Sequence, residues 1–347
     1  MTPHRRFLAI ALPLFVALQS CGAGITSLDV MDECEGLGLA GAPNPWFNAR
    51  GALVAYPLTL SALSAIVPIG GLNPPAHVYP TEFSYLVPTN PAAGVNKLLA
   101  PASGRVVRLY QPDDMGWTVV VQVDTSFFYY FGQITPLANI TVGSQMQVGQ
   151  WLGTNSGLAP NVAFGVYNFN KTSNIGILNT CLARTLKYTD SPFKYFAGPT
   201  QQALYDKVKV KGGATKDGRI DYDESGKLVG NWVLAGGPPT SEQDKALAFV
   251  YNVCHHALRI SIGSRLAGGG VFAVQPGATD FALITQAGGQ TNYRLFPTGV
   301  ADAGPPGAEI GVLAVQLISG TRIQVEFFPG ILTSAPTFTG GALLYDR

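Results

Sequence analysis

Side chains that bind metals or activate nucleophiles are scarce in this sequence. The 347 residues contain only four histidines and four cysteines. A catalytic zinc ion needs three protein ligands and one open position for water. The one local cluster of suitable residues is Cys254, His255 and His256. We predict that they lie on a strand, where successive side chains point to opposite faces, so they do not converge as metal ligands or as a nucleophile and its base.

The composition excludes several classes of function. Charged residues make up 12% of the chain and the net charge is +1, which provides no basic surface for nucleic acid. The sequence contains no P-loop, no nucleophile elbow and no dinucleotide-binding motif after a strand. The 41 glycines and 25 prolines are spread along a chain that is 47% hydrophobic, which indicates many short strands joined by turns.

The N-terminus has the features of an export signal. Three residues with basic character, His4, Arg5 and Arg6, precede an apolar segment at 7–18, which is too short to cross a bilayer core of about 30 Å as a helix. Leu-Gln-Ser-Cys follows at 18–21 and resembles a bacterial lipobox, which implies cleavage before Cys21 and lipidation of its sulfur. Ordinary cleavage without a lipid is the alternative. Residues 1–21 are predicted to be a signal peptide with a lipobox, and the exported protein to be a periplasmic or cell-surface lipoprotein anchored to the membrane at Cys21.

The remaining cysteines leave the disulfide pattern open. Cys34, Cys181 and Cys254 are an odd number, so at most one intramolecular disulfide can form among them. An exported protein can keep such a bond, but the sequence does not determine the pairing. Because an apolar run precedes Cys254, we predict a buried, inert thiol or one half of a disulfide there.

The mature chain is predicted to be mainly β. Segment 116–134 has the β-branched and aromatic runs of a buried sheet, and one clear helix is expected at 199–208. Between 245 and 347, strands recur at the spacing of a sandwich or barrel. The predicted regions are a tether at 22–54, a β domain at 55–170, a connector with a helix at 171–214 and a C-terminal β-rich domain at 215–347.

Several motifs between residues 68 and 169 occur in a specific order. Ala-Pro-Ala-Ser-Gly-Arg-Val at 100–106 is a turn between strands, and Val-Gly at 142–143 and Val-Gly-Gln-Trp-Leu-Gly at 148–153 form a glycine run. NPPAHVYPTEF at 73–83 contains the one histidine of this region. Together these motifs resemble the M23 zinc endopeptidases of the lysostaphin/LytM type, which cut peptide bridges in bacterial peptidoglycan. The resemblance implies a LytM-like antiparallel β domain, the duplicated hybrid motif, followed here by a second β barrel or sandwich.

The resemblance also implies five positions for a metal site. Its zinc ligands are a histidine, an aspartate and a second histidine, and two further histidines assist catalysis. In this chain His77 and Glu82 occupy the first two ligand positions, Ala163 occupies the third, and Gln133 and Asn161 replace the assisting histidines. Ala163 has no donor atom, and Asn and Gln do not exchange protons near neutral pH. We therefore expect no zinc, no other cofactor and no catalytic residue at this vestigial site.

These considerations favour a non-catalytic envelope lipoprotein that binds a peptidoglycan peptide or an envelope protein. Its predicted groove walls are Tyr79, Glu82, Tyr130, Gln133, Asn161 and Tyr167. One alternative is an M23-like zinc metallopeptidase with an atypical ligand set drawn from His77, Glu82 and a distant residue such as His256. Another is a carbohydrate-binding envelope protein that uses the aromatic run at 127–131.

Two further features have plainer interpretations. Segment 214–224 has partial EF-hand spacing, with Asp217, Asp221 and Glu224 at positions 5, 9 and 12 of the loop. Position 1 would be a glycine, so the first carboxylate is missing and we predict a charged turn instead. Trp232 could be a binding platform, but we predict a tryptophan of the core or of a sheet edge.

Overall fold

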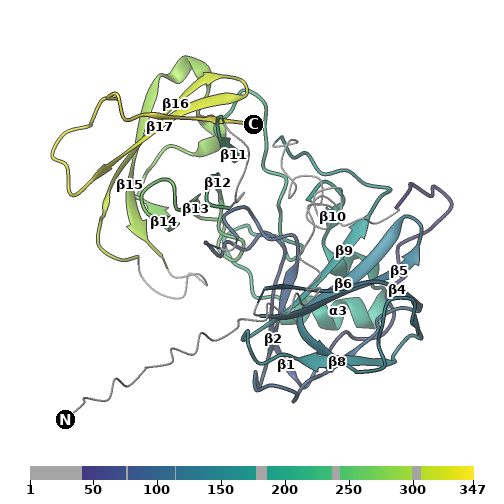
Figure 1. Ribbon diagram of the computed structural model, residues 1–347. Coiled ribbons are helices and arrows are strands. Elements are labelled where there is room, and N and C mark those ends of the chain that lie inside the picture. Colours follow the sequence, from purple (N-terminus) through teal and green to yellow (C-terminus); the bar gives the residue numbers. More distant parts are fainter. Residues whose placement is uncertain (1–40, 76, 114, 177–185, 237–242, 299–305) are drawn as a thin grey trace, which may run out of the picture.

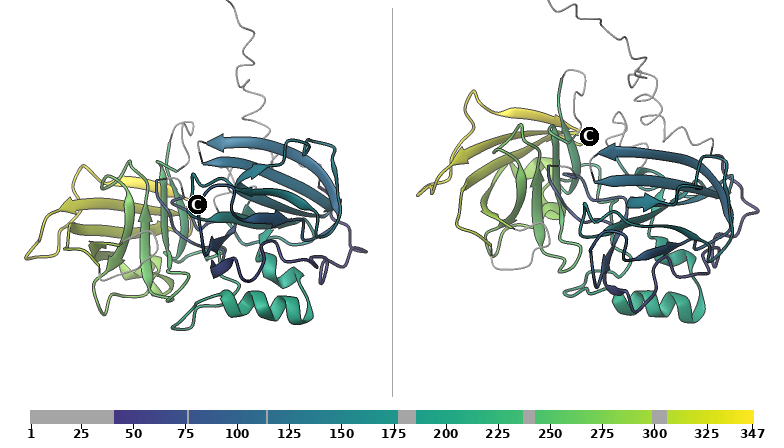
Figure 2. Two further views of the ribbon diagram at one scale, coloured as in Figure 1. Left: turned by 90° about the horizontal axis from the view of Figure 1, so that it is seen from below. Right: turned by 60° about the horizontal axis from the view of Figure 1, so that its bottom comes forward.

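The computed structural model describes residues 41–75, 77–113, 115–176, 186–236, 243–298 and 306–347 (Figure 1). They form two β-rich units side by side, an antiparallel sheet and a closed barrel (Figures 1 and 2). The mainly β fold class is therefore confirmed, and the C-terminal unit is a barrel. The predicted signal peptide, Cys34 and Cys181 lie outside the described residues. Across the described ranges, no helix is long and apolar enough to span a membrane.

The first unit is a ten-stranded sheet. Its main path has the order β1-β2-β9-β6-β5-β4-β7, while β10 pairs with β9, and β8 pairs with both β3 and β6. Neighbouring strands are antiparallel throughout. The strands are β1 Leu63–Val67, β2 Ser84–Pro88, β3 Lys97–Leu99, β4 Gly104–Asp113, β5 Gly116–Asp124, β6 Phe127–Pro136, β7 Gln145–Met146, β8 Trp151–Asn155, β9 Val162–Asn168 and β10 Thr189–Asp190.

The aromatic run of β6 is buried on both faces of the sheet. Because side chains alternate along a strand, Phe127, Tyr129 and Phe131 join one hydrophobic core, and Phe128 and Tyr130 join another on the opposite face. None of these five rings is more than 5% exposed. The carbohydrate platform proposed for 127–131 is therefore wrong, since a sugar can stack only on an accessible ring.

The connector packs under the first of these two faces. It contains the 3-10 helix η1 (Pro192–Tyr195) and helix α3 (Gly198–Lys207), which matches the expected helix to within one residue. Proline near the start of α3 fits the helix N-terminus, where its missing N–H costs nothing. Leu204 joins the sheet core, so α3 covers that face (Figure 2).

The second unit is a barrel closed by pairing of its first and last strands. Val233 of β11 is opposite Asp346 of β18, and Leu234 is opposite Tyr345. Trp232 is fully buried in the barrel core and its Nε1 donates to the Leu228 carbonyl at 2.9 Å, so it cannot be a binding platform. The strands are β11 Gly230–Leu234, β12 Ala246–Tyr251, β13 Leu258–Ile262, β14 Gly270–Val274, β15 Gln290–Pro297, β16 Gly311–Ser319, β17 Arg322–Pro329 and β18 Leu343–Asp346, with 3-10 helices η2 Phe281–Leu283 and η3 Gln286–Gly288 before β15.

Segment 69–79, between β1 and β2, contributes side chains to the hydrophobic core of the barrel. Ile69, Leu72, Val78 and Tyr79 belong to the same buried cluster as the barrel strands. The Tyr79 hydroxyl donates to the Trp232 carbonyl at 3.1 Å, and Tyr79 is 1% exposed. Tyr79 was predicted as a groove wall and is instead part of the packing that joins the two units.

Candidate functional site

Strands β2, β9 and β6 place three residues in line across the sheet. Tyr85 is opposite Ala163 in the β2–β9 pair, and Ala163 is opposite Gly132 in the β9–β6 pair. Ala163 is 4% exposed, and a Cβ added at Gly132 would lie 3.3 Å from the Ala163 methyl group. At the position predicted for the third metal ligand, Ala163 and Gly132 therefore form a tightly packed floor without a side-chain donor atom.

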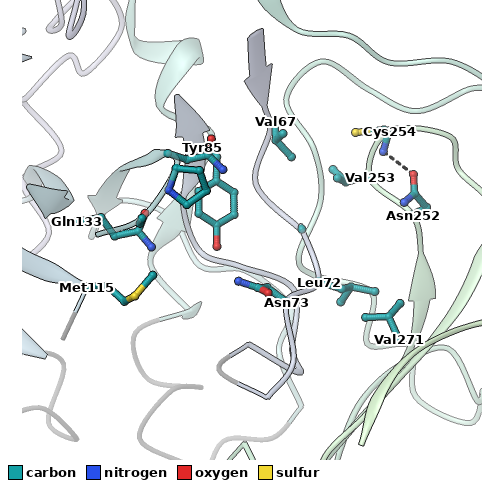
Figure 3. A pocket seen from close by; sticks show the side chains of 14 residues that line it. Val67, Leu72, Asn73, Tyr85, Met115, Gln133, Asn252, Val253, Cys254 and Val271 are labelled. Atoms are coloured by element: carbon teal, nitrogen blue, oxygen red, sulfur yellow. Dashed lines mark hydrogen bonds between the residues drawn. The ribbon is translucent and has the colours of Figure 1, made fainter. Parts of the chain in front are cut away.

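A pocket of about 360 Å³ lies beside this floor, where the two units meet (Figure 3). The first unit contributes Tyr85, Asn73 and two of the predicted vestigial residues, Gln133 and Asn161. The barrel contributes residues 252–254 and Val271 of β14. The structure thus brings Gln133 and Asn161 into one pocket, with Ala163 on the adjoining strand floor.

His77 and Glu82 do not line this pocket. His77 closes a small hairpin, in which its backbone N–H and carbonyl each bond to Asn73 at 2.8 Å. Its ring meets the edge of Phe83 at a centroid distance of 5.3 Å and an interplanar angle of 84°. The Glu82 carbonyl accepts a hydrogen bond from the Tyr130 hydroxyl at 3.2 Å. In the described part of the chain, no three His, Cys, Asp or Glu side chains lie close enough together to hold a metal ion.

Two tyrosines predicted as groove walls fill the face of the sheet instead of lining an open groove. Tyr130 and Tyr167 stack with centroids 4.9 Å apart and planes 14° apart, and they are 5% and 4% exposed. Tyr130 lies across Gly165, where an added Cβ would overlap its ring. Burial raises the pKa of both hydroxyls well above 10, and the negative charge of Glu82 adds to the rise. Both are therefore neutral, buried groups.

The pocket contains two polar atoms that make no hydrogen bond within the described structure. They are the Tyr85 hydroxyl and Gln133 Oε1. Burial raises the pKa of Tyr85, while the nearby Asn73 amide lowers it without forming a hydrogen bond of normal geometry and Glu82 raises it further. Tyr85 therefore keeps its proton and can donate. Figure 3 shows its hydroxyl directed into the space between Gln133 and Asn73.

Gln133 owes its position to an irregularity in β6. It follows Gly132 and has φ of 64°, a left-handed conformation that is uncommon for a residue other than glycine. The β5–β6 register shifts at this point, between the pairs of Trp117 and Val119. A bulge of this kind redirects a side chain out of the strand pattern, and here it points Gln133 into the pocket.

Residues 252–256 form a turn, so the prediction that Cys254, His255 and His256 lie on a strand is wrong. Asn252 Oδ1 accepts from the backbone N–H groups of Cys254 at 2.8 Å and His255 at 2.7 Å. Such local bonds compete with the strand ladder. His256 has φ of 52° and stacks on Tyr251 at 4.5 Å, which directs it away from a shared site with its neighbours.

The acidic side chains of segment 214–224 have separate partners. Asp217 accepts from the Tyr205 hydroxyl at 2.6 Å, and Asp221 pairs with Arg219 at 3.1 Å. Glu224 pairs with Lys227 at 2.6 Å. Their carboxylates are distributed around a turn instead of converging on one point, as an EF-hand loop would require.

The barrel wall of the pocket and Tyr85 were missed by sequence reasoning. Tyr85 stands in the alternating strand Ser84–Pro88, and its register opposite Ala163 follows only from the folded sheet. Val271 and residue 253 lie more than 160 residues further along the chain than Tyr85. No motif in the sequence connects them.

In comparisons with known proteins, this chain resembles only solved structures. No protein-family model matches the chain, and no curated protein does. Among solved structures, Csd3 of Helicobacter pylori is 21% identical over 35% of this chain and 33% of its own, with a TM-score of 0.28. The catalytic domain of the prophage-encoded M23 protein EnpA of Enterococcus faecalis, in mutant form, is 15% identical over 35% and 88%, with a TM-score of 0.26. Lysostaphin is 13% identical over 86% and 91%, with a TM-score of 0.29.

These likenesses are to proteins of the type that the motifs indicate, at low identity and partial coverage. This chain spans about a third of the length of Csd3. The TM-scores of the three are all below 0.3 and therefore carry no conclusion about function.

Proposed function

We propose that this protein is an exported, non-catalytic cell-envelope protein whose M23-like domain has lost its zinc site and binds a cell-wall peptide or a partner protein. The observation that supports the proposal is the burial of Ala163, a donor-free residue at the position where the resemblance implies the third zinc ligand. A zinc ion held only by His77 and Glu82 would lack the third protein ligand that catalytic sites have.

The packing around Ala163 supports the same interpretation. Tyr130 and Tyr167 occupy the sheet face with their rings stacked, and the Tyr130 hydroxyl is bonded to the Glu82 backbone. The segment that carries His77 is tied to the barrel core through Val78 and Tyr79. The donor set therefore does not fit a catalytic zinc, and no hydrolytic step is assigned to it.

Purified protein is expected to hold far less than one zinc ion per chain and to release no peptides from peptidoglycan. Metal content measured by elemental mass spectrometry after incubation with zinc, and hydrolysis with zinc or a chelator, would check both. The matched variant His77→Ala should give the same metal content as the wild type, because His77 alone cannot hold zinc in an open site.

Zinc binding together with peptidoglycan cleavage would instead support the metallopeptidase alternative. One zinc ion per chain, lost in His77→Ala, together with chelator-sensitive cleavage of peptidoglycan, would contradict the proposal. An active zinc endopeptidase assayed on the same peptidoglycan shows whether the substrate can be cut. Cleavage without dependence on zinc or His77 would place any activity outside this site.

Export and anchoring at Cys21 remain part of the proposal. The Cys21 thiol would carry the lipid, and a lipid chain adds membrane affinity in proportion to its buried methylenes. We expect the protein expressed in a bacterium to partition into detergent and to incorporate labelled fatty acid. Cys21→Ser should abolish both, whereas Cys254→Ser should retain them. Unchanged labelling in Cys21→Ser would refute the lipobox.

A further inference from the structure

The pocket at the junction of the two units offers a more specific conclusion about a ligand. It is separate from the ligand positions His77, Glu82 and Ala163, none of which lines it. Its volume of about 360 Å³ is at the lower end of the range for small-molecule pockets, which is about 300–1,000 Å³. It is therefore large enough for a small ligand or for one part of a longer one.

The described lining of the pocket is neutral. Among the residues that the structure describes, no Asp, Glu, Lys, Arg or His side chain contributes to it. A ligand that carried a formal charge into this pocket would lose its hydration without meeting a counter-charge. Apolar walls come from both units, with Val67 and Leu72 on one side and Val271 on the other. An uncharged ligand with a small apolar group fits these walls.

The polar atoms of the pocket define the remaining chemistry. The Tyr85 hydroxyl is a protonated donor without an acceptor, and Gln133 Oε1 is an acceptor without a donor. Buried polar atoms are normally hydrogen-bonded, so a pair left open in one pocket indicates partners supplied from outside. A secondary amide offers a carbonyl and an N–H within one rigid unit and satisfies both. The carboxamides of Asn73 and Asn161 can bind adjoining polar groups.

We propose that this interdomain pocket binds a neutral secondary amide with a small apolar substituent, and that the barrel forms part of the binding site. An uncharged peptide segment and the acetamido group of an amino sugar both present this chemistry. The proposal deepens the peptide-binding function suggested above by adding the ligand group and the second domain. It does not depend on the loss of zinc.

The test uses the full mature chain and isothermal titration calorimetry. The probes are N-acetyl-Ala-Ala-methylamide, the ester analogue that lacks the central N–H, and N,N′-diacetylchitobiose. At least one amide probe should bind. The ester analogue should bind about tenfold more weakly than the peptide if the peptide is the bound source, because Gln133 Oε1 would then stay unpaired. Binding of the peptide alone or of the sugar alone identifies the source, and binding of both supports the shared amide.

Two substitutions test the two walls of the pocket. Tyr85→Phe should weaken the binding of the amide probe about tenfold by removing the donor. Val271→Ala should weaken it about fourfold or more by removing apolar contact from the barrel side. Tyr188→Phe is the matched control, since its ring stacks on Phe169 outside the pocket, and it should bind as the wild type does. Thermal unfolding of each variant verifies that the fold is retained.

The inference fails if neither amide probe binds at millimolar concentration, or if Tyr85→Phe and Val271→Ala bind as tightly as the wild type. An effect of Tyr85→Phe without one of Val271→Ala would remove the barrel from the site. In each of these cases a protein without zinc and without hydrolytic activity would still satisfy the proposed function. Stoichiometric zinc with hydrolysis would overturn that function whatever the pocket binds.

Discussion

Asp223→Ala is expected to lower the free energy of unfolding of the barrel by about 3–5 kcal/mol at neutral pH, because it removes a buried carboxylate that accepts hydrogen bonds from N–H groups and neutralises part of a neighbouring cation. Asp223 is 3% exposed and accepts hydrogen bonds from the backbone N–H groups of Asn231, at 2.6 Å, and Gly176. Its counter-charge is Arg347. The substitution leaves two backbone N–H donors without their acceptor and the partly buried Arg347 cation without the charge of Asp223.

The position of Arg347 explains why the loss is large. Its guanidinium lies 3.8 Å from the Trp232 ring centroid and donates to the carbonyls of Glu224 and Val229, each at 2.7 Å. Burial lowers the pKa of Arg347 to about 10, although the charges of Asp223 and Glu224 oppose the decrease. The cation held in this place is neutralised mainly by Asp223, with a smaller contribution from Glu224.

Denaturant unfolding of the full chain measures the effect. Trp232 is the only one of the four tryptophans in the barrel, so its fluorescence reports the barrel transition. Asp221→Ala is the control, because Asp221 is exposed by 43% and forms only a surface pair with Arg219, so its cost should be below about 1 kcal/mol. Equal costs for the two variants would contradict the assigned role of Asp223.

The double variant Asp223→Ala/Arg347→Met measures the energetic coupling between the two charges. It should be more stable than Asp223→Ala alone, because the apolar methionine removes the unpaired charge. A double variant that is destabilised by the sum of both single effects would mean that the carboxylate acts only through its hydrogen bonds to N–H groups.

The pH dependence of this effect has a definite sign. Burial raises the pKa of Asp223, and Arg347 and the N–H groups only partly offset the rise. Between the unfolded pKa, about 3.9, and the higher folded value, the folded protein binds the proton more tightly, so the stability contributed by this group falls as pH rises. The difference in stability between wild type and Asp223→Ala should therefore shrink as pH rises through this window. A difference that grows there would contradict the direction of the pKa shift.

The fold class was visible in the sequence because it depends on local patterns. The runs in segment 116–134 predicted buried sheet, and the strand spacing after 245 left a sandwich or a barrel open. Closure of the barrel requires β11 to pair with β18, where Val233 meets Asp346. No local pattern specifies a pairing across more than a hundred residues, so this choice came only from the structure.

The candidate site could be predicted from the sequence only in part. The motif order predicted that Gln133 and Asn161 come together, and both line one pocket. It also placed Tyr79 there, but tertiary packing with Trp232 uses that side chain in the core. The prediction of a strand at 254–256 overlooked Asn252, whose type favours a turn through bonds to the following N–H groups. Asn252 therefore indicated a turn, but the apolar run before it favoured the prediction of a continued strand.

Gly218→Ala is expected to destabilise the protein by about 3 kcal/mol or more, since it combines an unfavourable backbone conformation with a steric clash. Gly218 has φ of +75°, and a Cβ there would overlap the carbonyl oxygen of Ile69. The two residues form a parallel bridge, and a Cβ at Gly70 would likewise overlap the carbonyl oxygen of Arg219. The backbone segments around Gly70 and Gly218 approach each other so closely that only glycine fits at these two positions.

Gly226→Ala distinguishes the cost of the backbone conformation from the cost of the steric clash. Gly226 has φ of +76°, and no atom lies within 4 Å of an added Cβ, so this variant should lose only the cost of the left-handed conformation, about 1–2 kcal/mol. The measurement is again denaturant unfolding, and equal losses for the two glycines would exclude the clash. The Ile69 segment continues into Leu72, which lines the interdomain pocket. Gly218→Ala should therefore also weaken binding of an amide probe under conditions where the chain remains folded, whereas Gly226→Ala should not.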